Sequence, residues 1–324
     1  MIHKRKIFFR ADAGSNIGYG HFIRSLALAD MLKEDFDCTF FTQTPTEYQK
    51  QEAASVCPLI SLPADDSRFN LFLQYLNGEE IVVLDNYFYT TEYQRQIKAK
   101  GCKLVCIDDM HNTHYVADMV INHAMGIKKE VFSIEDYTQL CLGTQYALLR
   151  RPFLDAIKKG APKPPKSTIE RIAICFGGSD PFHLTEKALE DLLPTPNLQH
   201  IDAIVGTHFK SLGKYKDPRI HFHQSISAQD VANIFSSCDL AIVSASSVCL
   251  EALACGAMLA VGWYVDNQHE GYEILNDTGW VIGLGDLTKT SFKPLTSNII
   301  TQKPNTIHWS DIRQNFIIAF NSLK

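Results

Sequence analysis

The residue with the clearest chemical potential is His21, which stands where a glycine-containing loop is expected to become a helix. Backbone N–H groups at a helix start carry partial positive charge and face outward, so they suit an anion or an electron-rich oxygen. The same field disfavours imidazolium, so we expect a neutral His21 that can act as a base near pH 7. The loop glycines, among them Gly18 and Gly20, would let a ligand approach the backbone closely.

Charged residues around this loop favour a functional site over the alternative, an ordinary surface histidine in a strand–loop–helix turn. Arg10 and Asp12 precede the glycines, and Arg24 follows His21 by one helical turn. Asp12 could either orient His21 or pair with Arg24, and the sequence leaves both possibilities open.

A second polar cluster is expected later in the chain, where apolar strands end in small residues. Gly177, Gly178 and Ser179 follow one such strand, at the carboxyl end where α/β sheets place their ligands. A simple turn would explain these three residues about as well. Ser246 and Ser247 follow another strand and open a helix, so they could donate to phosphate oxygens.

Glu251 lies four residues after Ser247 and therefore on the same face of that helix. A carboxylate there could accept hydrogen bonds from both hydroxyls of a ribose. The alternative is a solvated helix carboxylate, but the apolar neighbours of Glu251 predict a largely buried helix. Asn267 and Gln268 follow the next strand and add polar groups at the same sheet edge.

The elements that position these groups alternate between strand and helix along the chain. The expected strands are 7–10, 38–42, 81–85, 103–108, 119–122, 171–176, 200–205, 220–223, 239–244 and 258–262. The expected helices are 21–34, 46–54, 68–77, 91–100, 182–193, 227–237, 247–255, 268–277 and 309–323.

This alternation predicts an α/β protein with two doubly wound, Rossmann-like domains facing a cleft. Continuous apolar runs such as Ile81–Leu84 are typical of parallel strands that are covered on both faces. Residues 158–167 are rich in Pro, Gly and Lys and predict a linker between domains at 1–157 and 168–304. Residues 305–324 are expected to form a final amphipathic helix.

Composition and charge exclude several classes of partner. The chain of 324 residues has a net charge of −5, and no basic stripe dominates, which argues against nucleic acid or an anionic membrane. We expect no signal-peptide core and no membrane span, hence a cytoplasmic protein. The nine cysteines are expected to be reduced core residues. His111, His114 and His123 match no defined ligand set, so we expect no metal.

Several motifs, taken in order along nearly the whole chain, match one family. They are Arg10, Asp12, Gly18, Gly20, His21 and Arg24 around the first loop, Asp85-Asn86-Tyr87, Asp108-Asp109, Asp118 with Asn122, Tyr146 to Arg150, Gly177 to Asp180, Ser244 to Leu253, and Asn267-Gln268. In this set the chain resembles the UDP-2,4-diacetamido-2,4,6-trideoxy-β-L-altropyranose hydrolases of pseudaminic acid biosynthesis. That family is related to the lipid II-forming N-acetylglucosaminyltransferase. The resemblance implies a GT-B fold whose last helix crosses back onto the N-terminal domain.

The resemblance also implies a reaction, the hydrolysis of a UDP-linked 2,4-diacetamido-2,4,6-trideoxy sugar to free sugar and UDP. His21 would act as general base on a water that displaces UDP with inversion at the anomeric carbon. Tyr87 and Asn122 could position the sugar or the water, and core packing is an equal possibility for Tyr87.

The same resemblance implies a UDP site in the second domain that needs neither metal nor cofactor. The diphosphate would be held by Gly177, Gly178, Ser179, Ser246 and Ser247, the ribose by Glu251, the uracil by backbone near Ile226, and the phosphate or sugar by Asn267 and Gln268. Gly18 and Gly20 would lie against the substrate on the side of His21.

Two other functions stay open at this point. A GT-B glycosyltransferase that uses a UDP-amino sugar would need the same UDP site and a similar base. Residues 60–80 show no cluster of basic and apolar residues for an acceptor, which favours the hydrolase. A nucleotide-sugar binding module without chemistry is the third possibility, and His21 in its glycine loop argues against it. We expect a monomer.

Overall fold

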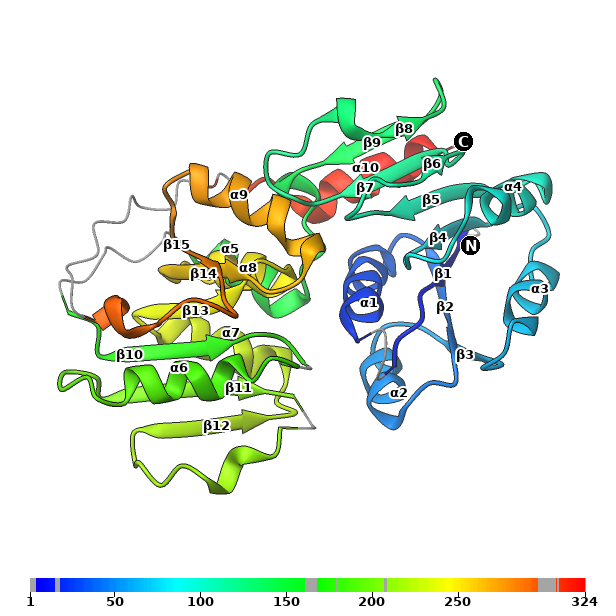
Figure 1. The fold of residues 1–324 in the computed structure, drawn as a ribbon. Helices are drawn as coiled ribbons and strands as arrows, with labels where there is room; N and C mark the ends of the chain where they lie inside the picture. The colour runs from blue at the N-terminus through cyan, green and yellow to red at the C-terminus, as the bar shows by residue number, and fades with distance from the viewer. Residues whose placement is uncertain are drawn as a thin grey trace. The chain divides into compact units, whose positions relative to one another are not determined.

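The computed structural model describes residues 4–14, 18–160, 168–178, 180–206, 209–296, 307 and 309–323, which form two compact units (Figure 1). The first unit comprises Met1–Arg151 with Trp309–Lys324, and the second comprises Pro152–His308. Most of the expected linker, residues 161–167, lies outside the described residues, and so does Ser179.

The first unit is built on a seven-stranded sheet in which every pair of neighbours is parallel. Its order is β3 (Leu59–Leu62), β2 (Asp37–Gln43), β1 (Lys6–Arg10), β4 (Ile81–Leu84), β5 (Lys103–Ile107), β7 (Met119–Asn122) and β9 (Gln139–Leu142). The short strands β6 (His114–Tyr115) and β8 (Ser133–Ile134) pair separately. The winding direction reverses between β1 and β4, and this is the switch point of a doubly wound sheet.

Alternate residues of β1 and β2 serve the two faces of this sheet, as the strand period of two requires. Phe9 and Phe40 stack on the face covered by helix α1 (Gly20–Leu32), where Phe22 of that helix meets Phe40 edge-on. On the opposite face lies a core cluster to which helices α3 (Ser67–Gln74) and α4 (Thr91–Ala99) contribute. Helix α2 (Glu47–Ala54) begins with a capping box formed by Thr46 and Gln49.

The last helix, α10 (Ile312–Ser322), belongs to the first unit and packs against α1 (red in Figure 1). Phe320 meets Phe36 with ring centroids 6.1 Å apart, and Phe316 meets Tyr146 at 5.4 Å. An ion pair of 2.5 Å between Arg313 and Asp35 adds a polar contact at the rim. The apolar face expected for this helix is therefore buried.

The second unit has a six-stranded parallel sheet with the order of a dinucleotide-binding fold. The order is β12 (Ile220–Gln224), β11 (His200–Val205), β10 (Arg171–Cys175), β13 (Leu240–Ser244), β14 (Leu259–Trp263) and β15 (Val281–Asp286). Its helices are α6 (Leu184–Leu192), α7 (Ala228–Ser237), α8 (Ser247–Ala254) and α9 (His269–Asp277). The strand order reverses between β10 and β13, so the switch point of this sheet lies there.

Most expected elements are present within a few residues of their predicted ends. The strands β3, β6, β8, β9 and β15 and helix α5 (Arg151–Lys159) were not predicted. Helix α5 corrects the predicted linker start at 158, because Lys158 and Lys159 form its last turn. Cations suit a helix C-terminus, so a lysine pair there does not end the helix early.

The burial of α10 generates a stability prediction. Phe320→Ala should lower the free energy of unfolding by about 3–5 kcal/mol, because it removes a fully buried ring and leaves a cavity. Ile318→Ala on the same helix is the control, since Ile318 is 61% exposed and should change stability by no more than about 0.5 kcal/mol. Urea unfolding of both variants measures the difference, and equal effects would contradict the docking of α10.

Candidate active site

A buried charged cluster lies at the switch point of the first unit, where β1 and β4 end side by side. Asp85 directly follows β4, and its backbone N–H donates to the carbonyl of Arg10 at the end of β1. Helix α1 presents three side chains to Asp85 from its first two turns, those of His21, Arg24 and Ser25. Ligands of open α/β sheets bind at this position, so the cluster is our candidate active site.

Asp85 accepts hydrogen bonds on both carboxylate oxygens. His21 Nδ1 lies 2.7 Å from Oδ1, Arg24 donates through Nε and Nη2 at 2.7 and 2.5 Å, and the Ser25 hydroxyl donates at 2.9 Å. All four residues are buried. The arrangement holds one carboxylate in a two-pronged contact with a guanidinium and joins it to an imidazole.

Burial alone would raise the pKa of Asp85, but the charge of Arg24 and the bonds from Arg24 and His21 outweigh it and hold that pKa well below its usual range. The carboxylate is therefore ionised at neutral pH and can only accept. Arg24 Nη2 also lies 3.0 Å from His21 Nδ1, but it donates to Asp85 Oδ1 at 2.5 Å, so the proton on Nδ1 is the one that faces Asp85 at 2.7 Å. A neutral His21 consequently has its lone pair on Nε2, which is the tautomer a general base needs.

A second carboxylate and a tyrosine complete the exposed side of the cluster. Asp109 Oδ2 accepts from Arg24 Nη1 at 2.9 Å and from the Tyr87 hydroxyl at 3.0 Å. The Tyr87 ring meets the His21 ring edge-on at 4.6 Å. Tyr87 is 53% exposed, so it is not a core residue, and the packing alternative does not apply to it.

Asp12 takes neither role that the sequence left open for it. It is fully buried and forms a two-bond ion pair with Arg10, and it also accepts from the backbone N–H of Gln43 at 2.8 Å. Asp85 instead both orients His21 and pairs with Arg24. The reason is geometric, because the Asp12 carboxylate meets the Arg10 side chain and the end of β2, whereas β4 ends beside α1.

Asn122 is buried and directed at the neighbouring turn. Its amide Nδ2 donates to Asp108 Oδ2 at 3.2 Å, and its Oδ1 accepts from the backbone N–H of Ala124 at 2.9 Å. Asp108 Oδ1 also accepts from the Tyr115 hydroxyl at 2.6 Å. These contacts make Asn122 a support for the turn that presents Asp109.

The glycine loop closes on itself before α1 begins. Gly14 and Gly18 exchange backbone hydrogen bonds, and Gly18 has a φ of +78°, which a side chain would strain. Residues 15–17 lie outside the described part of the loop. Gly20 is exposed at the first position of α1, and Tyr19 before it makes no side-chain capping bond. The first N–H groups of α1 are therefore not capped by Tyr19.

The second unit brings most of the expected UDP-site residues to the carboxyl ends of β10, β13 and β14. Gly177 has a φ of +92° and lies against the Tyr264 hydroxyl, which donates to the Phe176 carbonyl at 2.9 Å. Gln268 is buried, and its Oε1 accepts from the Tyr264 N–H at 3.2 Å, whereas Asn267 is exposed. Gly178 is exposed, and Ile226 lies half-buried in the loop after β12.

The two helix starts at this edge differ in their capping. The Asp180 carboxylate accepts from the first N–H groups of α6, those of Leu184 and Thr185 at 2.8 and 2.9 Å. At α8 the N-cap Ser246 makes no side-chain capping bond, Ser247 is exposed, and Glu251 is buried one turn further on. The start of α8 is therefore the better anion site of the two.

The three histidines considered as metal ligands take separate partners. The His111 ring meets the Phe132 ring at 5.9 Å, His114 bonds to Ser133 and Glu135, and His123 Nδ1 accepts from the backbone N–H of Leu148. Among the described residues, no group of three or more His, Cys, Asp or Glu side chains is arranged to hold a metal ion. The described helices include none that is both long and apolar enough to cross a membrane.

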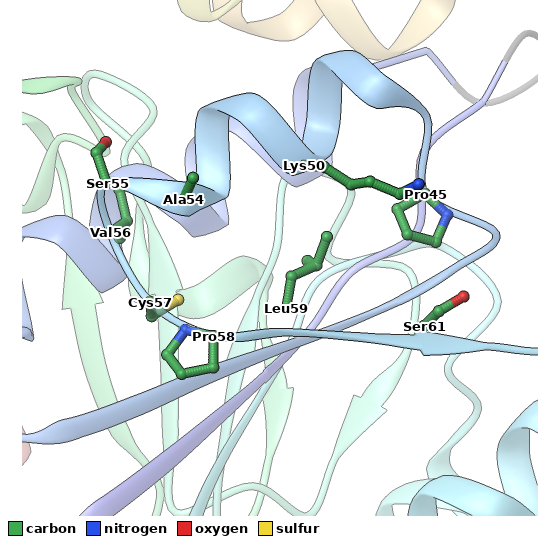
Figure 2. A pocket seen from close by; sticks show the side chains of 9 residues that line it. All are labelled: Pro45, Lys50, Ala54, Ser55, Val56, Cys57, Pro58, Leu59 and Ser61. Carbon is green, nitrogen blue, oxygen red and sulfur yellow. The ribbon is translucent and has the colours of Figure 1, made fainter.

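Two hollows of different character lie in the first unit. One of about 610 Å³ lies beside α2 and β3 and is lined by Pro45, Lys50, Ala54, Ser55, Val56, Cys57, Pro58, Leu59 and Ser61 (Figure 2). Its one charged side chain, Lys50, pairs with Glu47, so it offers no catalytic group. The other, of about 30 Å³, is lined by His21 and Asp85 and is polar. The smaller hollow is therefore the one that borders the candidate catalytic residues.

The known proteins to which the chain is similar in sequence are distant relatives. No protein-family model matches the chain. An uncharacterized protein of Methanocaldococcus jannaschii is 26% identical over 93% of this chain, which spans only 63% of that protein. The UDP-2,4-diacetamido-2,4,6-trideoxy-beta-L-altropyranose hydrolase of Campylobacter jejuni is 25% identical over 83% of this chain and 98% of its own length. The spore coat polysaccharide biosynthesis protein SpsG of Bacillus subtilis is 23% identical over 85% of this chain and 82% of its own length.

Solved structures show the fold. MurG of Acinetobacter baumannii has a TM-score of 0.65 at 13% identity, with 98% of this chain and 99% of that chain covered. Arabidopsis thaliana UGT89C1 complexed with UDP has a TM-score of 0.64 at 11% identity, with 99% of this chain and 94% of that chain covered. The predicted α/β class and GT-B fold are confirmed.

The sequence alone assigned no role to Asp85 and Asp109. Both stand in motifs that were recognised, Asp85-Asn86-Tyr87 and Asp108-Asp109, and each directly follows or closely follows a buried strand. Their positions after strands could have identified them, because the side chains that follow parallel strands gather at one edge of the sheet. Their partners on α1 lie about sixty or more residues away in the chain.

The environment of His123 generates a prediction on pH. Burial, with the nearby charge of Arg24, lowers the pKa of His123 to about 4. As the pH falls below about 6.5, the unfolded chain therefore takes up this proton before the folded chain does. The free energy of unfolding should decrease between about pH 6.5 and pH 4 for this reason.

Substitution separates this contribution from those of the other histidines. His123→Asn keeps an acceptor near the position of Nδ1 but cannot be protonated, so its stability should decline less than that of the wild type over this pH range. Urea titrations at four or five pH values measure the slopes, and identical slopes for the wild type and His123→Asn would refute the assignment.

Proposed function

We propose that the protein is a UDP-sugar hydrolase that releases UDP and free sugar from a UDP-linked 2,4-diacetamido-2,4,6-trideoxy sugar, in pseudaminic acid biosynthesis. The similarity to the Campylobacter jejuni hydrolase over nearly all of that protein supports the substrate class. The GT-B fold and its neighbour complexed with UDP support the nucleotide.

One observation carries the proposal, the buried Asp85 carboxylate that holds His21 through Nδ1. In the reaction we propose, His21 Nε2 takes a proton from water as the water oxygen bonds to the anomeric carbon. The bond from that carbon to the UDP oxygen breaks, and UDP leaves with the electron pair. Asp85 stabilises the imidazolium that results, and Arg24 keeps Asp85 ionised throughout.

The leaving group would be held by the second unit. We assign the diphosphate to Gly177, Gly178, Ser179 and the start of α8 at Ser246 and Ser247, the ribose to Glu251, the uracil to the backbone at Ile226, and further phosphate or sugar contacts to Asn267 and Gln268. The uncapped start of α8 supports this assignment. In the first unit, Tyr87 would contact the sugar, with Gly18 and Gly20 giving it access, and Asn122 would act indirectly through the Asp108 turn.

A glycosyltransferase that transfers a UDP-amino sugar is the second candidate, because the neighbours with this fold include the calicheamicin glycosyltransferase CalG4 at a TM-score of 0.59. The two candidates differ in one measurement. The hydrolase releases UDP from the diacetamido sugar nucleotide when no acceptor is present, and a transferase releases little. Coupled detection of UDP, with the free sugar identified by mass spectrometry, decides between them.

The role of His21 predicts a separation of catalysis from nucleotide binding. His21→Gln should lower kcat by roughly two to four orders of magnitude, the range for loss of a general base. UDP affinity should stay within a few-fold, because the proposed UDP contacts lie in the second unit. Steady-state kinetics with calorimetry of UDP checks both, and near-normal turnover would remove His21 from the mechanism.

The proposed role of Glu251 predicts a loss of nucleotide binding. Glu251→Ala should weaken UDP binding by about 1.5–3 kcal/mol, the range for hydrogen bonds to a charged group. Glu190→Ala, at an exposed carboxylate of the same unit, is the control and should leave UDP affinity unchanged. Calorimetry that finds equal affinities for the two variants would place the ribose contact elsewhere.

A further inference from the structure

The cavity of about 30 Å³ beside His21 contains polar groups that the reaction scheme above does not use. Its lining includes His21, Asp85, Asp108 and Tyr115, together with Tyr89 and Gln94 from the segment after β4. Tyr89 is 6% exposed and Gln94 is not exposed at all. Neither the Tyr89 hydroxyl nor Gln94 Nε2 has a hydrogen-bond partner among the described residues.

The orientation of the Gln94 amide is fixed by its other end. Gln94 Oε1 accepts from the backbone N–H of Val116 at 3.0 Å, so Nε2 must be the donor left over. Buried donors without partners are costly and rare in native proteins, and donors that lack a protein partner usually bind ordered water. The Asp108 carboxylate in the same lining can accept from that water, because its Oδ2 accepts only from Asn122 among the described residues.

The size of the cavity selects the ligand. A space of at least about 10–15 Å³, measured by the positions open to a water-sized sphere, holds one water, so 30 Å³ holds one or two. A sugar acceptor is far larger. An apolar ligand would leave the Tyr89 and Gln94 donors unpaired.

We propose that this cavity is a water site, in which Tyr89 and Gln94 hold one or two ordered waters that supply the nucleophile to His21. This role rests on the proposed hydrolase function. One water gives its proton to His21 Nε2, its oxygen bonds to the anomeric carbon, and UDP departs with the electron pair of the broken bond. Tyr89 and Gln94 are positioning residues, because they act through the water, and the small cavity confines nucleophiles to the size of water.

The first test uses two neighbouring buried tyrosines whose rings stack 5.6 Å apart. Tyr93 donates to the Phe69 carbonyl at 3.2 Å and does not line the cavity, so Tyr93→Phe shows the effect of losing a partnered hydroxyl. If the Tyr89 hydroxyl binds water, Tyr89→Phe should lower Tm by a similar amount, about 2–4 °C for one hydrogen bond. If it binds nothing, removing it should leave Tm unchanged or raise it, which would overturn the water site.

The second test asks where the nucleophile comes from. Tyr89→Phe should lower kcat about tenfold with KM within two-fold, and Tyr93→Phe should leave both unchanged; an unchanged kcat for Tyr89→Phe would overturn the positioning role. In 10% methanol the wild type should yield only free sugar. A methyl glycoside formed in proportion to methanol would show that the nucleophile comes from open solvent. If the protein hydrolyses no UDP-sugar, the proposed function and the nucleophile role fail together, and the Tm comparison still decides the water site.

Discussion

The buried carboxylate of Asp85 is the constraint on which the first unit's site depends. A charge that is removed from water must be compensated by ion pairing and hydrogen bonds, and here nearly all the compensation comes from one helix. His21, Arg24 and Ser25 of α1 all donate to it, so the carboxylate fixes how α1 begins relative to β4. The position of the candidate base is thereby tied to the same interactions that make a buried charge tolerable.

The topology explains why such a cluster can exist at this point. Crossovers leave β1 and β4 in opposite directions, so the ends of these two strands are not covered by a shared connection. Polar groups gather there because a bound ligand can satisfy them, whereas apolar groups fill the sheet faces. Asp109, at the turn after β5, extends the cluster toward solvent and binds both Arg24 and the half-exposed Tyr87.

The sequence predicted the parallel sheets well, because runs such as Ile81–Leu84 are apolar on both faces. It missed β15, which carries Gly283 and Gly285, and β3, a short edge strand after Pro58, since neither shows a continuous apolar pattern. His21 could be singled out from the sequence by its glycines together with the charged residues around them. Its partner was not, because Asp12 is near in sequence, whereas Asp85 becomes adjacent only through the pairing of β1 with β4.

In the second unit, the partial positive charge at a helix start can attract a ligand only where no side chain of the protein already neutralises it. Helices α6 and α8 begin next to the switch point, after strands β10 and β13. Asp180 places a carboxylate on the N–H groups of α6, so that helix end is already neutralised and attracts a phosphate less than an uncapped helix start does. At the start of α8, the N-cap residue is Ser246, whose side chain is uncharged and makes no capping hydrogen bond. In the proposed reaction, a diphosphate would therefore be attracted to Ser246 and Ser247, one helical turn from the buried Glu251.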